Sequence, residues 1–229
     1  MLIQGSVGQP STTSIPAGTT PTIRQGQLGD VIVSELHGRF YEQVYRANLF
    51  SVGTTGVVAL SANTVSLTST TTPILGIYNP ATSTNNCVVL QASLQAFINT
   101  FTTPVSAGAF VWASSVGNTA VSTGVTPFNR KTLASAGAQG RGFAGATALT
   151  GLTNNLVIFE GSDFVSPTAL TYGTIVAPTA GTSLTSFGGV QNFDGSIIVP
   201  PGGVLALLNT TSTTTMSYTG RLLWEEVPL

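Results

Sequence analysis

The segment CVVLQASLQAFI, residues 87–98, decides the fold class because apolar and polar side chains alternate along it. The apolar set comprises Val88, Leu90, Ala92, Leu94, Ala96 and Ile98. The positions between them hold Gln91, Ser93 and Gln95. A period of two is the pattern of a strand with one face in a core and the other in water or at an interface. The segment therefore predicts a long, half-buried β-strand.

Shorter apolar runs, separated by residues that favour turns, lie on both sides of this segment. They occupy residues 57–60, 65–68, 74–78, 110–112 and 156–159. The connections are rich in Gly, Ser and Thr, and the whole chain contains 26 Gly and 12 Pro. Many short strands joined by such turns are typical of an all-β protein.

The C-terminal segment GSIIVPPGGVLALLNTTSTTTMSYTGRLLWEEVPL, residues 195–229, predicts three further strands. They span residues 197–199, 204–208 and 216–224, and the sequence PPGG separates the first two. We expect these three strands to form one compact antiparallel sheet. Several short strands at regular spacing favour a sandwich over a parallel sheet.

The domain organisation follows from length and composition. An all-β domain commonly reaches roughly 200–250 residues, so we predict a single antiparallel β-sandwich over residues 30–229. Residues 1–29 are rich in Ser, Thr, Gly and Pro and predict an extended N-terminal arm. Isolated apolar residues along it, such as Ile3 and Ile15, either fill grooves of a neighbouring subunit or belong to a flexible tail. The composition leaves both alternatives open.

The segment DVIVSELHGRFYEQVYRANLF, residues 30–50, carries much of the charge of the chain, and no charged residue follows Arg46 until Arg130. Its apolar residues fit both a helical and a strand period. We favour strands because Gly38 interrupts a helix and because Tyr, Phe and Val prefer strands. The charges fit a solvated or internally paired edge, or contacts that set register and specificity with a partner. The candidate interface residues are Arg39, Tyr41, Glu42, Tyr45, Arg46 and Arg141.

The low charge of the chain predicts association. Charged residues make up 7% of the sequence and the net charge is −1, against about 25% charged residues in a typical soluble domain. A surface of this kind tends to associate, so we predict a closed homo-oligomer. A nucleic-acid partner requires clustered basic residues, and the chain has one lysine and dispersed arginines, so we expect no nucleic-acid partner. Neither a secretory signal nor a membrane-length apolar run is present, so we expect synthesis in a cytoplasm and no membrane partner.

Catalytic, metal and cofactor sites are not predicted. His37 is the single histidine and no Gly-x-Ser-x-Gly motif occurs, which argues against a hydrolytic triad and a zinc site. Cys87 is the single cysteine and fits a small buried apolar residue. The segment GAQGRGFAG, residues 137–145, has the glycine spacing of a dinucleotide motif but lacks the strand before it and the helix after it. We expect a mobile surface loop there, with Arg141 at its tip.

Three segments resemble small all-β virion proteins of tailed bacteriophages, of the jelly-roll kind that decorates or cements capsids. They are IIVPPGGVLALL (residues 197–208), RLLWEEVPL (221–229) and LHGRFYEQVYRANLFSVGTTG (36–56). The resemblance covers less than half of the chain, and residues 100–155 have no counterpart in it. It implies a jelly-roll subunit, trimeric, that is located on the virion and binds the major capsid protein or another virion protein.

Two other functions stay open at this point. One is a phage tail, baseplate or fibre component that binds a receptor or a tail protein. The other is a carbohydrate-binding or hydrolytic β-protein, which for a sugar would need an aromatic platform. The candidate residues for such a platform are dispersed along the sequence: Trp112, Tyr172 and Trp224.

Overall fold

The computed structural model describes residues 5–7, 23–25, 39–54, 58–59, 72–98, 110–121, 124–135, 137–145, 148–164, 186–209 and 216–229. The chain divides into two compact units, Met1–Tyr41 and Glu42–Leu229. In the first unit β1 (Gly5–Val7) pairs in parallel with β2 (Ile23–Gln25). Most of the predicted arm, and its boundary at residue 29, lie outside the described residues.

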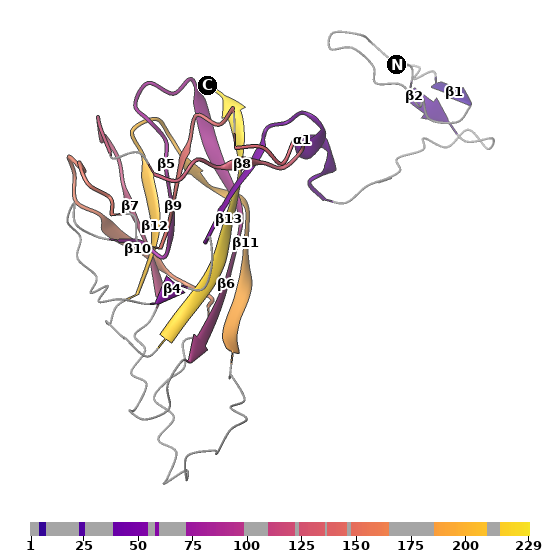
Figure 1. The fold of residues 1–229 in the computed structure, drawn as a ribbon. Helices are drawn as coiled ribbons and strands as arrows, with labels where there is room; N and C mark the ends of the chain where they lie inside the picture. Colours follow the sequence, from indigo (N-terminus) through magenta and orange to yellow (C-terminus); the bar gives the residue numbers. More distant parts are fainter. Residues whose placement is uncertain are drawn as a thin grey trace, which may run out of the picture. The chain divides into compact units, whose positions relative to one another are not determined.

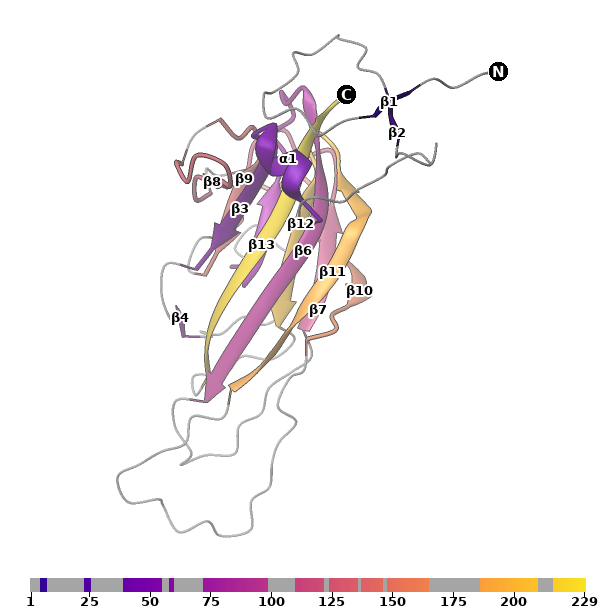
Figure 2. The same ribbon diagram turned by 90° about the vertical axis from the view of Figure 1, so that its right-hand side faces the viewer.

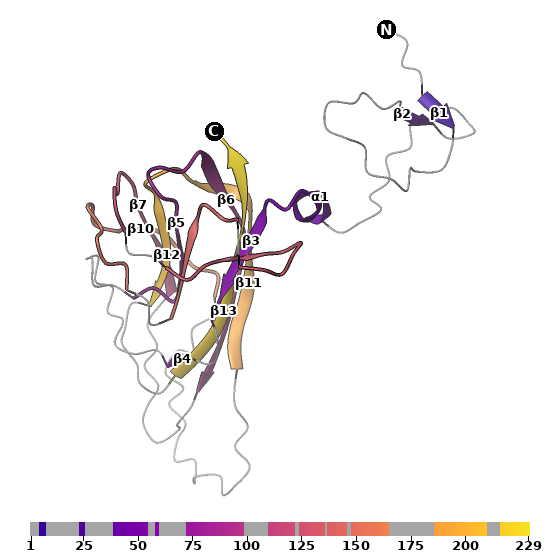
Figure 3. The ribbon, with the colours of Figure 1, turned by 45° about the horizontal axis from the view of Figure 1, so that its top comes forward.

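The second unit is an antiparallel sandwich of two sheets (Figures 1 and 3). The first sheet has the strand order β11 (Ser186–Val199), β6 (Asn85–Ile98), β13 (Met216–Pro228), β3 (Leu49–Gly53) and β8 (Phe128–Asn129), and β4 (Val58–Ala59) also pairs with β13. The second sheet has the order β10 (Val157–Gly161), β7 (Phe110–Ser115), β12 (Val204–Asn209), β5 (Leu75–Tyr78) and β9 (Arg141–Ala144). The prediction of an all-β sandwich is confirmed, and the jelly-roll connectivity stays a prediction.

The alternating segment forms β6, the strand between β11 and β13, but its buried face changes partway along. Cys87 and Val89 are buried at one end, whereas Ala92 and Leu94 are buried further on. The pairing with β13 passes from Gln91 directly to Val89, and the pairing with β11 does the same, so Leu90 has no partner in either ladder. One extra residue reverses the alternation. The prediction that Val88 shares the inward face with Ala92 is therefore wrong.

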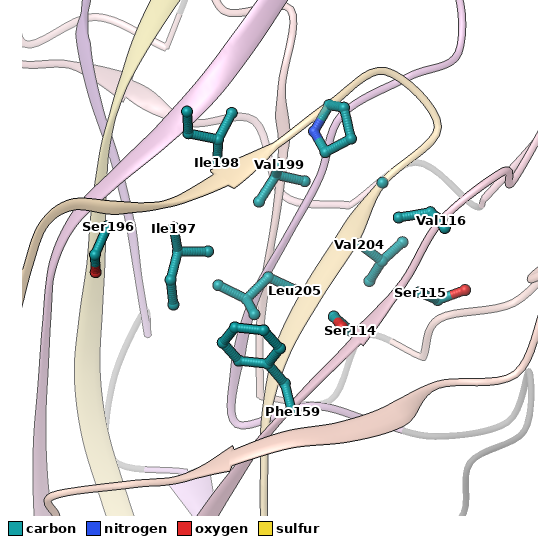
Figure 4. Close-up of a pocket in the computed structure, with 12 residues that line it drawn as sticks. Ser114, Ser115, Val116, Phe159, Ser196, Ile197, Ile198, Val199, Val204 and Leu205 are labelled. Atoms are coloured by element: carbon teal, nitrogen blue, oxygen red, sulfur yellow. The ribbon is translucent and has the colours of Figure 1, made fainter.

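The three C-terminal strands exist but do not form one sheet, because β12 belongs to the other sheet. The turn between Val199 and Val204 carries the chain from the first sheet to the second (Figure 4). Every residue of β12 is buried. A continuous apolar run such as VLALL is expected where both faces of a strand are covered, and this burial distinguishes β12 from the alternating strands β11 and β13.

The core has two parts. The larger part lies between the sheets and includes Trp112, Trp224 and Leu222. The smaller part covers the outer face of the second sheet, where Leu149 and Leu156 pack with residues of β7 and β12. Burial on both faces makes the second sheet a rigid support for the edge strands beside it.

Two local predictions are wrong. Residues 41–45, expected as a strand, form the helix α1 (Tyr41–Tyr45), and Ala47 in the turn after it has a φ of 63°. The N–H of Ala47 donates to the carbonyl of Val44, and the N–H of Asn48 donates to the carbonyl of Gln43, so the turn satisfies the last carbonyls of the helix.

Residues 141–144, expected as a loop, form β9. Gly142 lets this strand approach Val52 of β3, because an added Cβ would lie 2.5 Å from the Cβ of Val52.

A candidate interaction surface at the edge of the sandwich

The edge strands β10 and β11 lie on the same side of the sandwich (Figure 2). A groove opens there, lined by residues of β7, β10, β11 and β12 (Figure 4). Its volume is about 240 Å³. In the close-up, Phe159 of β10 and Ile197 of β11 point toward Leu205 of β12, which is almost fully buried. The lining contains apolar side chains, three serines, glycine and proline, and no charged residue. Such a groove suits an uncharged apolar group.

The strand β10 exposes an unusual amount of apolar surface. The exposed fractions are 65% for Val157, 50% for Ile158 and 55% for Phe159. The register with β7 skips Phe159, so this residue is a bulge. A bulge re-aims a side chain and interrupts an edge that could otherwise add a further strand. The bulge therefore directs Phe159 into the groove.

Trp112 fixes the relative position of the two edge strands. Its Nε1 donates a hydrogen bond of 2.9 Å to Oε1 of Gln191 in β11, and Ser162 donates to the same oxygen at 3.3 Å. The ring of Phe193 packs edge-on against Trp112 with centroids 5.3 Å apart. These contacts tie β11 to β7 beside the groove. Trp112 is fully buried, as is Trp224, so neither offers a platform for a sugar, and Tyr172 lies outside the described residues.

Of the candidate interface residues in the second unit, Tyr45, Arg46 and Arg141 do not line this groove. Tyr45 and Arg46 follow one another at the end of α1, and Lys131 donates to the carbonyl of Tyr45 at 2.7 Å with its Nζ 4.9 Å from the centroid of the ring. Burial raises the pKa of Glu225, and the charge of Arg46 opposes this shift. The structure thus brings Tyr45 and Arg46 together with two residues that the sequence did not place beside them.

The remaining candidates have different positions. Arg39 lies in the first unit with its guanidinium 5.4 Å from the centroid of the Phe40 ring, and Tyr41 begins α1. The side chain of Glu42 is outside the described part. Arg141 does not stand at a loop tip but begins β9, and its guanidinium donates to the carbonyl of Ala138 at 3.0 Å. Arg141 therefore supports the turn that precedes its own strand.

A buried carboxylate that the sequence analysis did not single out fixes the same turn. Glu226 of β13 accepts hydrogen bonds from the backbone N–H groups of Gly140 at 2.8 Å and Gln139 at 3.0 Å. Cys87 lies close by, and burial together with the charge of Glu226 raises the pKa of its thiol. A protonated thiol of this kind is a poor nucleophile. The alternation of Leu222, Trp224 and Glu226 along β13 is the signal that indicates an inward carboxylate.

Within the described ranges, no group of three or more His, Cys, Asp or Glu side chains is arranged to hold a metal ion. No helix in the described part of the chain has the length and hydropathy to cross a membrane. No family model matches the sequence, and neither the curated proteins nor the solved structures include one that is similar to it.

Proposed function

We propose that this protein is a non-enzymatic structural component of a virion, a decoration or cement subunit that binds the major capsid protein as a homotrimer. One observation carries the proposal: a sandwich with very few charges exposes large apolar side chains along its edges. Among them are three consecutive residues of the edge strand β10, Val157, Ile158 and Phe159, each at least 50% exposed, and clustered exposed apolar residues mark interaction sites. The resemblance of residues 36–56, 197–208 and 221–229 to phage decoration proteins supports the virion as the place of assembly.

The test is to locate the protein on particles. Particles purified from the cells in which the chain is made are labelled with antibodies against it and imaged by electron microscopy, and their protein content is measured by mass spectrometry. We expect label over the capsid, in many copies per particle. Label confined to the tail would replace the proposal by the tail, baseplate or fibre alternative. Particles that lack the protein altogether would refute a structural role in the virion.

A further inference from the structure

Three acidic residues gather at one edge of the sandwich, and most of its basic residues gather at the opposite edge. The acids are Glu160, Asp163 and Asp194, and the basic residues are Arg46, Arg130, Lys131 and Arg141. The other charged residues of this unit are Glu42, Arg221, Glu225 and the buried Glu226, and of these Glu225 lies near Arg46 and Glu226 binds the turn before β9. The three acids lie in or beside β10 and β11, whereas Arg130, Lys131 and Arg141 lie in or beside β8 and β9. These strand pairs are on opposite sides of the sandwich (Figure 2). We name the two sides the acidic edge and the basic edge.

The acidic edge contains the apolar groove. Glu160 follows Phe159 directly in β10, and Asp194 belongs to the bulge of β11 just before Ser196, which lines the groove. Asp163 and Asp194 are exposed and Glu160 is half-buried. The groove is thus an uncharged hollow with carboxylates beside it. A dry cavity of about 150 Å³ already accommodates benzene, so the volume of about 240 Å³ is sufficient for a leucine side chain.

The basic edge displays a leucine in a strained conformation. Leu133 is 73% exposed and has a φ of 58°, a left-handed conformation that favours Gly or Asn. Asn129 builds the turn that imposes it: its carbonyl accepts from the N–H of Leu133 at 2.9 Å, and its Oδ1 accepts from the N–H of Lys131 at 2.9 Å. An exposed apolar side chain held in a strained turn makes Leu133 a candidate for a contact with a partner. Arg130 and Lys131 stand beside it.

We propose that Leu133 of one copy inserts into the β10–β11 groove of a second copy, with Arg130 and Lys131 facing Glu160, Asp163 and Asp194. The inference rests on the proposed function of an assembling subunit and names the contact that assembles it. Charge complementarity selects a second copy as the occupant, since carboxylates lie beside the groove and basic residues lie beside Leu133. The bulges in β10 and β11 interrupt both edges, so side chains dock here and strands are not added.

The geometry makes the contact heterologous, because each copy uses one edge as donor of the leucine and the other as its receptor. Heterologous contacts close into rings when the rotation between copies permits and otherwise extend into filaments. A trimer requires a contact of this type, since an isologous contact pairs only two copies.

Cross-linking between full-length copies tests the contact. One chain carries Ala134→Cys, beside Leu133, and the other carries Ser114→Cys, in the groove; both changes keep Leu133 and Phe159 in place. The native Cys87 is buried and does not interfere. After mixing and treatment with a short bismaleimide, we expect a linked pair on a denaturing gel. The matched control pairs Ala134→Cys with Gln95→Cys, an exposed position on the outer face of the first sheet, and we expect little product from it.

Charge reversal gives an independent test by light scattering. Glu160→Lys with Asp163→Lys, and separately Arg130→Glu with Lys131→Glu, should each weaken self-association about tenfold or more. A chain with all four changes should assemble again, because both edges are reversed together. Leu133→Asn should weaken assembly similarly while the melting temperature stays the same or rises, because Asn tolerates the left-handed conformation.

The outcomes separate this contact from the proposed function. Two results would overturn the contact and leave the virion role standing. One is an oligomer in which Ala134→Cys links equally well to Gln95→Cys. The other is a chain with all four charge changes that does not assemble again. A chain that stays monomeric at high concentration would also overturn it. If Leu133→Asn abolished capsid binding while the oligomer remained, the basic edge would bind the coat protein and the inference of self-docking would be wrong.

Discussion

Glu226 shows that a charge near the end of a strand can be part of the interior. Its carboxylate is 4% exposed and accepts from two backbone N–H groups of the turn before β9. In Glu226→Gln the amide N–H₂ would face one of these donors, so a buried donor would lose its acceptor. We expect the free energy of unfolding to fall by about 1–3 kcal/mol, as measured by urea denaturation at pH 7.

Glu225 provides the matched control, on the same strand. Its folded-state pKa is raised by burial, so its charged form disfavours the fold above that pKa and the penalty disappears as the pH falls through it. Glu225→Gln should therefore leave stability unchanged or slightly increased at pH 7, within about 0.5 kcal/mol, with the difference fading in acid. Equal losses for the two variants would show that Glu226 has no special role.

At the residue scale, sequence patterns predict which side chains are buried better than they predict which residues those side chains contact. The burial of Cys87 was predicted from a strand pattern and is confirmed. The inward position of Glu226 follows from alternation with Trp224, yet its acceptor role depends on a turn 86 residues away in sequence. The strain at Leu133 depends on the hydrogen bonds of Asn129. Such pairings are properties of the folded chain and leave no local periodicity.

At the scale of elements, strands were predicted where alternation or apolar runs are clear. The exceptions have local causes. The bulge at Leu90 reverses the face of β6 and cannot be seen in a pattern that stays regular through it. The assignment of β12 to the second sheet depends on which strand pairs with it. Gly142 in β9 resembles a loop residue, but the strand has no side chain there because it packs closely against the side chain of Val52.

Gly142 tests this explanation of β9. An added Cβ would meet the Cβ of Val52 at 2.5 Å, so β9 would have to move away from β3. We expect Gly142→Ala to lower the free energy of unfolding by about 1–3 kcal/mol. Gly161→Ala in β10 is the control, since nothing lies within 4 Å of the position that its methyl group would occupy, and it should change stability by no more than about 1 kcal/mol. A neutral Gly142→Ala would contradict the close approach.

At the scale of the whole molecule, the all-β fold and the tendency to associate were both predicted from composition and pattern, and the fold is confirmed. The gathering of three acidic residues at one edge was not predicted. Glu160 and Asp194 are far apart in the sequence and meet at one edge only because β10 and β11 are the outer strands of the two sheets. Association, and the role of Arg141 and the candidate residues between 30 and 50 in it, stay predictions.

The arm gives the last prediction. Every residue of the two core clusters lies between Phe50 and Trp224, and both docking edges lie in the same unit. Deleting residues 1–29 should therefore leave the far-ultraviolet circular dichroism, the melting temperature and the oligomer unchanged. Binding to particles should weaken, because Ile3, Ile15 and the prolines would no longer be available to contact the shell.

Circular dichroism, light scattering and co-sedimentation with particles check these three expectations separately. Fixing an extended segment costs roughly 1–2 kcal/mol per residue in backbone entropy, so an arm that binds must make dense contacts, and its removal must be measurable. Unfolding of the truncated chain would place the arm in the core. Loss of the oligomer alone would mean that the arm, and not the pair of charged edges, holds the copies together. Unchanged binding to particles would show that residues 1–29 are a tail.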